Sequence, residues 1–134
     1  MPVPTEATYS VAAKVAAHAA LRDVIDSGAG AGYIEVRGDA LQLLATIPLA
    51  DPCGTVNGTT GQLTLSIAGS DPSADATGTA AYADVCDSTG AAHLSLPAQA
   101  GTTWVAGKIV LNSLSIVTGT EVSILSAVIG EGEE

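Results

Sequence analysis

Apolar positions follow one period near the N-terminus and a different one through the rest of the chain. Over residues 10–27 they recur at the spacing of an α-helix, with Leu21 and Ile25 on one side of the helical wheel. Ser10 suits the N-cap of such a helix, and Gly28 suits the residue that follows a helix end. The pattern therefore predicts one helix over residues 10–27.

The predicted helix carries the only basic stripe of the sequence, formed by Lys14, His18 and Arg22 at a spacing of four residues. Most other positions are alanine, and Asp23 and Asp26 fall on the far side. The stripe can contact an acidic neighbouring subunit, compensate the charge of the chain's own sheet, or stay in solvent. We take Lys14, His18 and Arg22 as the candidate subunit interface.

From residue 32 to 129 the period changes to two, which is the period of β-strands. Over 62–68, leucine and isoleucine alternate with glutamine, threonine and serine. Six to eight short strands of this kind, each with one apolar face, predict a mainly β fold. The expected architecture is a β-sandwich or jelly-roll-like barrel preceded by one N-terminal α-helix.

Two hairpins are expected within this β region. If Gly38-Asp39 is a two-residue turn, Val36 lies opposite Leu41 in the first hairpin. In the second hairpin, a four-residue turn over 87–90 places Val85 opposite Ala92. The same register places Asp84 opposite His93.

The remaining connections are read from turn-forming residues. Residues 69–77 and 97–105 are expected to be loops, and 118–120 is expected to close an odd-length loop between the last strands. The glycine-alanine run at 28–32 follows a helix and precedes a strand, which is the reverse of a dinucleotide-binding loop, so we interpret it as a connector.

The whole chain, 1–134, is expected to be a single domain. Its parts are the helix at 10–27, the β-sandwich at 32–129 and a solvated acidic tail at 130–134. With no Phe, one Trp, one Met and three Tyr, its core must be built from Leu, Ile, Val and Ala. Small side chains bury little area each, so we expect association with other subunits to add stability.

The charge of the chain restricts its partners. Four Lys and Arg against fourteen Asp and Glu give a net charge of -10. This charge repels phosphates, so we expect no nucleic acid or anionic membrane as partner. No apolar run approaches a membrane span, and Met1 to Ser10 lacks the pattern of a signal peptide. Synthesis in a reducing cytoplasm follows from this.

The two cysteines, Cys53 and Cys86, are expected to be small buried thiols, with a disulfide between them as the alternative. Two cysteines alone cannot form a zinc site. Asp71 and Asp75 in the 70–75 loop can be calcium ligands, but aspartates in such loops are more often turn formers. No cofactor or metal is therefore expected.

Catalysis would need converging titratable groups. His93 and Asp84 can form a base and its orienting partner, with Ser95 or Cys86 as the nucleophile. A cross-strand histidine-aspartate pair is also an ordinary surface contact, and no Gly-x-Ser-x-Gly motif is present. We therefore expect no enzyme activity and no catalytic residues.

The tripeptide Arg37-Gly38-Asp39, at the expected hairpin tip, matches the integrin-binding sequence. Gly-Asp is also good turn chemistry, and three-residue matches arise by chance, so we interpret the tripeptide as a turn.

Several phrases of the sequence, taken in order, resemble one group of proteins. They are LRDVIDSG at 21–28, YIEVR at 33–37, LATIPL at 44–49, DPSADATGTA at 71–80, DSTG at 87–90 and LNSLSIV at 111–117. This order resembles small proteins of tailed bacteriophages that are encoded near virion structural genes. The resemblance covers most of the chain from Val11 to Ile129 and brings no active-site residues with it.

The resemblance implies a virion structural protein, made in the host cytoplasm and carried on the capsid surface. Our first hypothesis is a capsid decoration or cement protein that binds the major capsid lattice as a homo-oligomer, such as a trimer. A tail, collar or fibre component bound to another virion protein is the second. A glycan- or receptor-binding module is the third, for which only Trp104 and three tyrosines are available as aromatic contacts.

Overall fold

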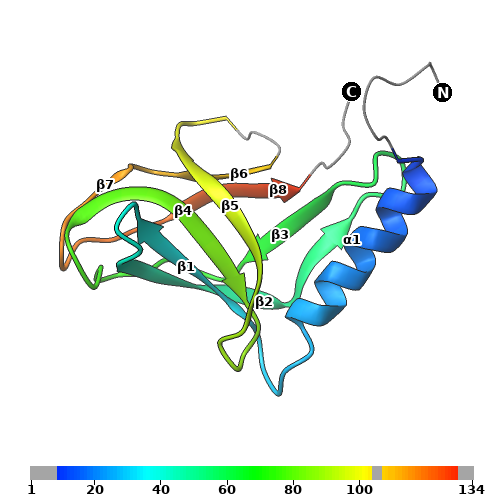
Figure 1. Cartoon of the computed structure of the whole chain (residues 1–134), viewed down its shortest axis with the longest axis horizontal. Helices are drawn as coiled ribbons and strands as arrows, with labels where there is room; N and C mark the ends of the chain where they lie inside the picture. Colours follow the sequence, from blue (N-terminus) through cyan, green and yellow to red (C-terminus); the bar gives the residue numbers. More distant parts are fainter. Residues whose placement is uncertain (1–8, 104–106, 130–134) are drawn as a thin grey trace.

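A computed structural model describes residues 9–103 and 107–129 of the protein. The fold is mainly β, with one N-terminal helix and a closed seven-stranded β-barrel (Figure 1). This confirms the predicted fold class at the level of a β-barrel with a preceding helix. The expected acidic tail at 130–134 and Trp104 lie outside the described residues.

The elements follow one another in a simple order. They are α1 (Val11–Ile25), β1 (Tyr33–Gly38), β2 (Leu43–Val56), β3 (Leu63–Ile67), β4 (Gly78–Cys86), β5 (Ala92–Ala100), β6 (Lys108–Leu111), β7 (Ser115–Ile116) and β8 (Ile124–Ile129). The helix begins and ends close to the predicted positions, and Ser10 is its N-cap, accepting a hydrogen bond from the Ala13 amide. Within the described ranges, no helix has both the length and the apolar content that a membrane crossing requires.

The barrel closes because β1 pairs with two strands. Seven strands follow one another around it in the order β1-β2-β3-β8-β6-β5-β4, and β4 pairs back with β1. All of these pairings are antiparallel except that between β5 and β6. The two-residue strand β7 adds to the start of β4.

The interior of the barrel is filled by aliphatic side chains, as in other small barrels. The largest fully buried ones include Ile34, Val36, Leu44, Ile47, Leu63, Val85, Ile109 and Leu111. In β3, Leu63 and Leu65 are buried and Thr64 is exposed, as the alternation predicts. Ile25, from the last turn of α1, joins the same cluster.

The first hairpin has the predicted strands but not the predicted register. Val36 lies opposite Ala45, not Leu41, and Ile34 lies opposite Ile47. The turn is longer than two residues because Leu41 adopts a left-handed conformation, with φ of 68°. Its amide donates to the Gly38 carbonyl at 2.9 Å. Because this shift is even, Ala45 and Ile47 still face inward, but the register changes again between Val36 and Arg37, so Leu43 lies opposite Arg37 and Leu44 is buried instead.

The second hairpin differs from the prediction in the same way. Val85 lies opposite Leu94, not Ala92. Cys86 is already one residue beyond the predicted register, opposite Ala92, and the bulge between Val85 and Cys86 adds the second residue. Asp84 therefore lies opposite Ser95, and the predicted pairing of Asp84 with His93 is wrong.

One connection was also assigned wrongly. The loop expected to begin at Pro97 is in fact part of β5, which runs on to Ala100. Pro97 is the last residue paired with β4, and pairing with β6 begins at Ala98, so the strand changes partner there. Residues 117–120 form a turn, but β7 before it pairs with β4 and not with β8.

Candidate functional site

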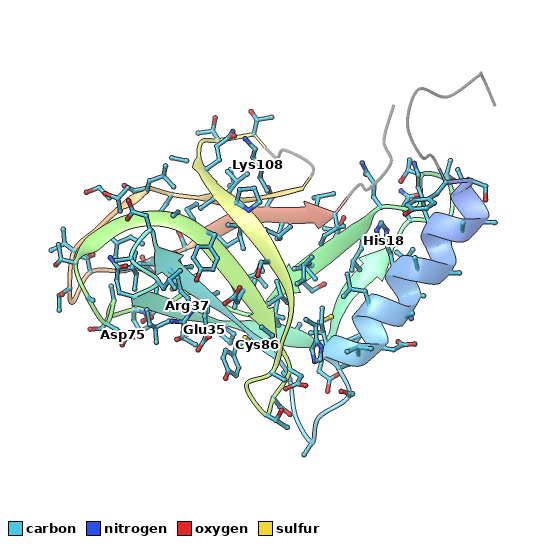
Figure 2. All side chains as sticks on the ribbon, viewed as in Figure 1. His18, Glu35, Arg37, Asp75, Cys86 and Lys108 are labelled. Carbon is cyan, nitrogen blue, oxygen red and sulfur yellow. The ribbon has the colours of Figure 1, made fainter. Side chains whose placement is uncertain are left out.

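The predicted basic stripe of α1 faces the protein's own barrel. His18 is only 5% exposed, and its Nδ1 lies 2.5 Å from the carbonyl oxygen of Gly61, to which it donates. Lys14 and Arg22 are half-buried on either side of it. Figure 2 shows His18 directed from the helix toward the strands. The stripe is therefore a packing surface between α1 and the β2–β3 connection.

Close approach at this seam depends on Gly61. Its φ of 78° is in the left-handed region that glycine tolerates. A Cβ at this position would come within 2.5 Å of the Lys14 Cβ. The backbone of Gly61 can present its carbonyl to His18 only because no side chain separates the two segments.

The C-terminal end of α1 is fixed to an irregular stretch of β2. The register of β2 against β3 shifts between Leu49 and Gly54. Within that stretch the Cys53 amide donates to both carboxylate oxygens of Asp26, at 3.0 and 3.1 Å. The Cys53 thiol donates to the Arg22 carbonyl at 3.7 Å. The helix end thus supplies the acceptor that the strand pairing lacks.

Both cysteines are free and buried, as predicted. Burial, followed by the nearby Asp26 carboxylate, raises the pKa of the Cys53 thiol to about 12. Burial, followed by Glu35 and Asp84, raises the pKa of the Cys86 thiol to about 11. Neither thiol has the lowered pKa that an activated cysteine nucleophile needs.

The outward face of α1 is apolar where a surface helix is usually polar. The exposed residues of the helix are Val11, Ala12, Ala13, Ala16, Ala17, Ala20, Asp23 and Val24. Asp23 is the single charged side chain in this set, and it is paired with Arg22 at 3.3 Å. The prediction that Lys14, His18 and Arg22 contact another subunit stays a prediction, and what α1 turns to solvent is mainly alanine and valine.

A polar cluster lies on the outer face of β1 and β4, where Glu35 is directly opposite Asp84. Two carboxylates in this relation repel each other unless a cation lies between them. Arg37 supplies it, with one guanidinium nitrogen 2.9 Å from Glu35 and another 3.6 Å from Asp84. The hydrogen bond to Glu35 raises the pKa of Arg37. Glu35 and Arg37 are labelled in Figure 2.

The groups considered for catalysis are divided between two separate contacts. Ser95 donates its hydroxyl to Asp84 at 2.5 Å. The nearest carboxylate partner of His93 is Asp87, with Nε2 2.9 Å from Oδ2. The expected chain of Asp84, His93 and Ser95 is therefore not assembled, because the bulge moves His93 along the strand.

Asp87, which the sequence reasoning used only as a turn residue, organises the 87–91 loop. Its carboxylate accepts hydrogen bonds from the Thr89 hydroxyl at 2.6 Å, the Thr89 amide at 2.9 Å and the Ala91 amide at 3.2 Å. The Thr89 hydroxyl first, and then His93, hold the pKa of Asp87 well below its ordinary value. The Asp-x-Thr spacing is the sequence signal that could have identified this capping role.

The two aspartates considered as calcium ligands, Asp71 and Asp75, make different contacts within the chain. Asp71 is buried and accepts from the Thr46 amide at 2.9 Å and the Ser73 amide at 3.0 Å. Asp75 is exposed, and its amide donates to the Leu44 carbonyl. Across 9–103 and 107–129, no cluster of three His, Cys, Asp or Glu is arranged to hold a metal ion. Asp71 fastens the 70–75 loop to β2, as a turn former would.

The hairpin tip between β1 and β2 does not present Arg37-Gly38-Asp39 as one extended unit. The Arg37 side chain bends back over the sheet to Glu35 and also donates to the Leu41 carbonyl at 3.0 Å. Leu41, which sequence reasoning placed in the apolar face of a strand, is instead 66% exposed at this tip. The sequence could not indicate the left-handed conformation of Leu41, because leucine rarely adopts a positive φ.

Comparisons of the chain with protein-family models, with curated proteins and with solved structures found no match. Function is therefore inferred from the geometry and from the resemblance of sequence phrases. The polar clusters described above bind to other parts of the same chain. The exposed large apolar side chains of the described residues include Val11 and Val24 on α1 and Leu41 at the hairpin tip.

Proposed function

We propose that this protein is a structural component of a tailed-phage particle, and specifically a capsid decoration or cement protein. It binds the major capsid lattice from outside as a homo-oligomer. The observation that carries the proposal is the reversed polarity of α1, whose polar stripe packs on the barrel while alanine and valine face solvent. A helix of this kind is suited to a protein neighbour.

The composition of that surface supports the same conclusion. Alanine side chains are short, so another protein can approach the helix backbone closely and lose little side-chain entropy on binding. The net charge of -10 favours a partner with basic patches. The closed barrel behind the helix gives a rigid support. The narrower description of this barrel as a sandwich or a jelly roll stays a prediction.

The physical role follows from mass action. Packaged DNA strains an icosahedral shell from inside. A protein that binds only the expanded shell stabilises that form in proportion to the binding free energy it contributes. The protein then needs a docking surface and a rigid body, with no reaction to perform.

A tail, collar or fibre component is the alternative within the virion, and it uses the same surface. A glycan- or receptor-binding module is favoured by a different observation. Tyr33 and Tyr82 lie on the same outer face as Glu35, Arg37 and Asp84, which is a combination that sugars can contact. On this alternative the sheet face, and not the helix, is the binding surface.

Copy number per particle tests the proposal. The protein is dissociated from purified particles of the phage that encodes it and quantified against the major capsid protein. A copy number that scales with the number of capsid subunits supports decoration. A copy number equal to the subunits of a single ring supports a collar or tail component. Binding of the isolated protein to host polysaccharide, with none to empty shells, would overturn the virion assignment.

A further inference from the structure

Leu41 combines two unfavourable features at one residue. Its φ of 68° is the only left-handed conformation of a non-glycine residue in the described part of the chain. Its side chain is 66% exposed, more than any other large hydrophobic residue there. A left-handed backbone costs free energy for any residue with a Cβ, and leucine gains nothing from solvent.

The fold does not require leucine at this position. The turn is closed by backbone bonds, with the Gly38 amide donating to the Gln42 carbonyl and the Leu41 amide to the Gly38 carbonyl. Glycine or asparagine would make the same bonds with less strain. An observed strain of this kind is a pointer to function.

The surroundings of Leu41 are acidic. Asp39 and Asp75 are exposed, and neither forms an ion pair within the described ranges. Arg37 beside them is already bound to Glu35 and Asp84. The tip is therefore an apolar point with a negative rim. It lies at the end of the barrel away from α1 (Figure 1), the end at which Figure 2 labels Asp75.

The opposite end of the molecule carries a complementary surface. Lys14, Ala17, Leu21 and Val24 are spaced three, four and three residues apart, so they form one flank of α1. Val24 is 42% exposed, and Leu21 is half-buried beside it. Lys14, at the end of this flank, forms no ion pair with any described residue. The flank is an apolar strip that ends in a positive charge.

We propose that the hairpin tip of one copy docks on the α1 flank of a second copy. Leu41 lies between Leu21 and Val24 of the neighbour, and Asp39 lies near the neighbour's Lys14. Asp39 has few basic side chains to contact in a second copy, because the chain has only four Lys and Arg, and Lys14 is one of them. This inference gives the geometry of the homo-oligomer on which the proposed function relies.

The contact is head-to-tail, since the two surfaces are different and lie at opposite ends of the barrel. Every copy in such an assembly uses its own tip and its own α1 flank. Contacts of this type form a closed ring when the rotation between copies closes, and an open filament when it does not. A ring matches a decoration protein, because it leaves the exposed alanines of α1 outside this flank, Ala13, Ala16 and Ala20, free for the shell.

Sedimentation of the purified full chain over a range of concentrations tests the contact. The natural protein is expected to form a discrete oligomer. Leu41→Gly is expected to weaken self-association ~10-fold or more, the effect of losing a central contact residue. Its melting temperature is expected to be unchanged or higher, because the strain is removed. Leu125→Ala is the matched control, since Leu125 is 52% exposed on β8 and outside both surfaces.

Mixing two variants distinguishes a head-to-tail contact from a symmetric one. Leu41→Gly retains only the α1 flank, and Val24→Lys retains only the tip, so each is expected to be monomeric. Together they should form a one-to-one dimer that grows no further. If Leu41→Gly alone still dimerises, or Val24→Lys alone does, the contact is symmetric and the inference is overturned.

The charge contact has its own test. Asp39→Lys should weaken association, and combining it with Lys14→Glu in the same chain should restore it. A natural protein that stays monomeric at all concentrations overturns the inference. If that monomer still attaches to shells, the capsid decoration role survives without its homo-oligomeric form. An oligomer that forms through this contact but never attaches to shells supports the contact and contradicts the capsid role.

Discussion

Two polar clusters of this protein have opposite relations to solvent. On α1, His18 is buried and bound to the Gly61 carbonyl, between half-buried Lys14 and Arg22. On the outer face of β1 and β4, Glu35 and Arg37 are also bound to neighbours but remain partly exposed. The first cluster joins the helix to the barrel, and the second lies across the strand pair that closes the barrel.

The comparison shows that the surface packed against a stripe of charged residues decides whether that stripe is buried or exposed. When the helix is considered alone, Lys14, His18 and Arg22 look like a face for solvent or for another subunit. The carbonyl of Gly61, forty-three residues after His18, accepts a hydrogen bond from His18, so this side of the helix faces the barrel. Because both clusters are bound mainly within the chain, the exposed face of α1 is left largely apolar. The following predictions test how strongly each cluster supports the fold.

The largest effect is expected at Gly61. Gly61→Val forces a β-branched residue into a positive φ and places its Cβ against Lys14. Strain and overlap together should lower the free energy of unfolding by about 3 kcal/mol. Denaturant unfolding measures this. Gly58→Ala is the control, because a Cβ there has nothing within 4 Å, and its stability should stay within about 0.5 kcal/mol of the natural protein.

His18→Ala should have the next largest effect. It leaves the buried Gly61 carbonyl without its donor and opens a small cavity under α1. We expect the free energy of unfolding to fall by about 2 kcal/mol. The outward-facing substitution Ala20→Ser should change it by less than about 0.5 kcal/mol. If both variants are equally stable, the helix does not dock through His18.

The outer cluster should contribute less because it is partly solvated. Arg37→Met leaves Glu35 and Asp84 opposite each other without a cation and should cost about 1 kcal/mol. Adding Glu35→Gln removes the repulsion and should recover most of that loss. A double-mutant cycle measured by thermal unfolding gives the coupling. Additive losses would mean that Arg37 acts through packing alone.

The smallest effect is expected at Asp87 and takes the form of a pH dependence. Its pKa is lowered in the folded protein, so its stabilising effect is full above the ordinary value of 3.8 and is lost as the pH falls below it. Asp87→Asn should therefore be less stable than the natural protein near neutral pH. The difference should shrink steadily as unfolding is measured in more acidic buffers. A constant difference at all pH values would contradict this role.

Where the spacing of apolar residues alone determines an element, the sequence was sufficient to predict that element. The α1 boundaries and the inward face of β3 follow from spacing and from Ser10 as N-cap. Strand registers were not predictable in the same way. They depend on a left-handed Leu41 and on a bulge after Val85, and neither has a residue type that marks it. The second error kept the inward face because the shift was by two residues, whereas the first hairpin lost Leu41 and Leu43 from that face.

The candidate site was harder to predict than the fold. Burial of His18 depends on the backbone conformation of Gly61, which no local pattern around His18 contains. The partner of His93 changed from Asp84 to Asp87 because the bulge altered the register. Free buried thiols and the turn role of Asp71 were predicted correctly, since these follow from residue type alone.

Closure of the barrel through the β1–β4 pairing has a consequence for how the protein behaves when it is concentrated. Among the described residues, each of its seven strands pairs with two others, with β2 and β5 changing partner along their length, so no strand of the barrel ends the sheet. Open edges recruit strands from other molecules and lead to aggregation. Many copies can therefore be crowded together, and their contacts remain limited to side chains on defined surfaces.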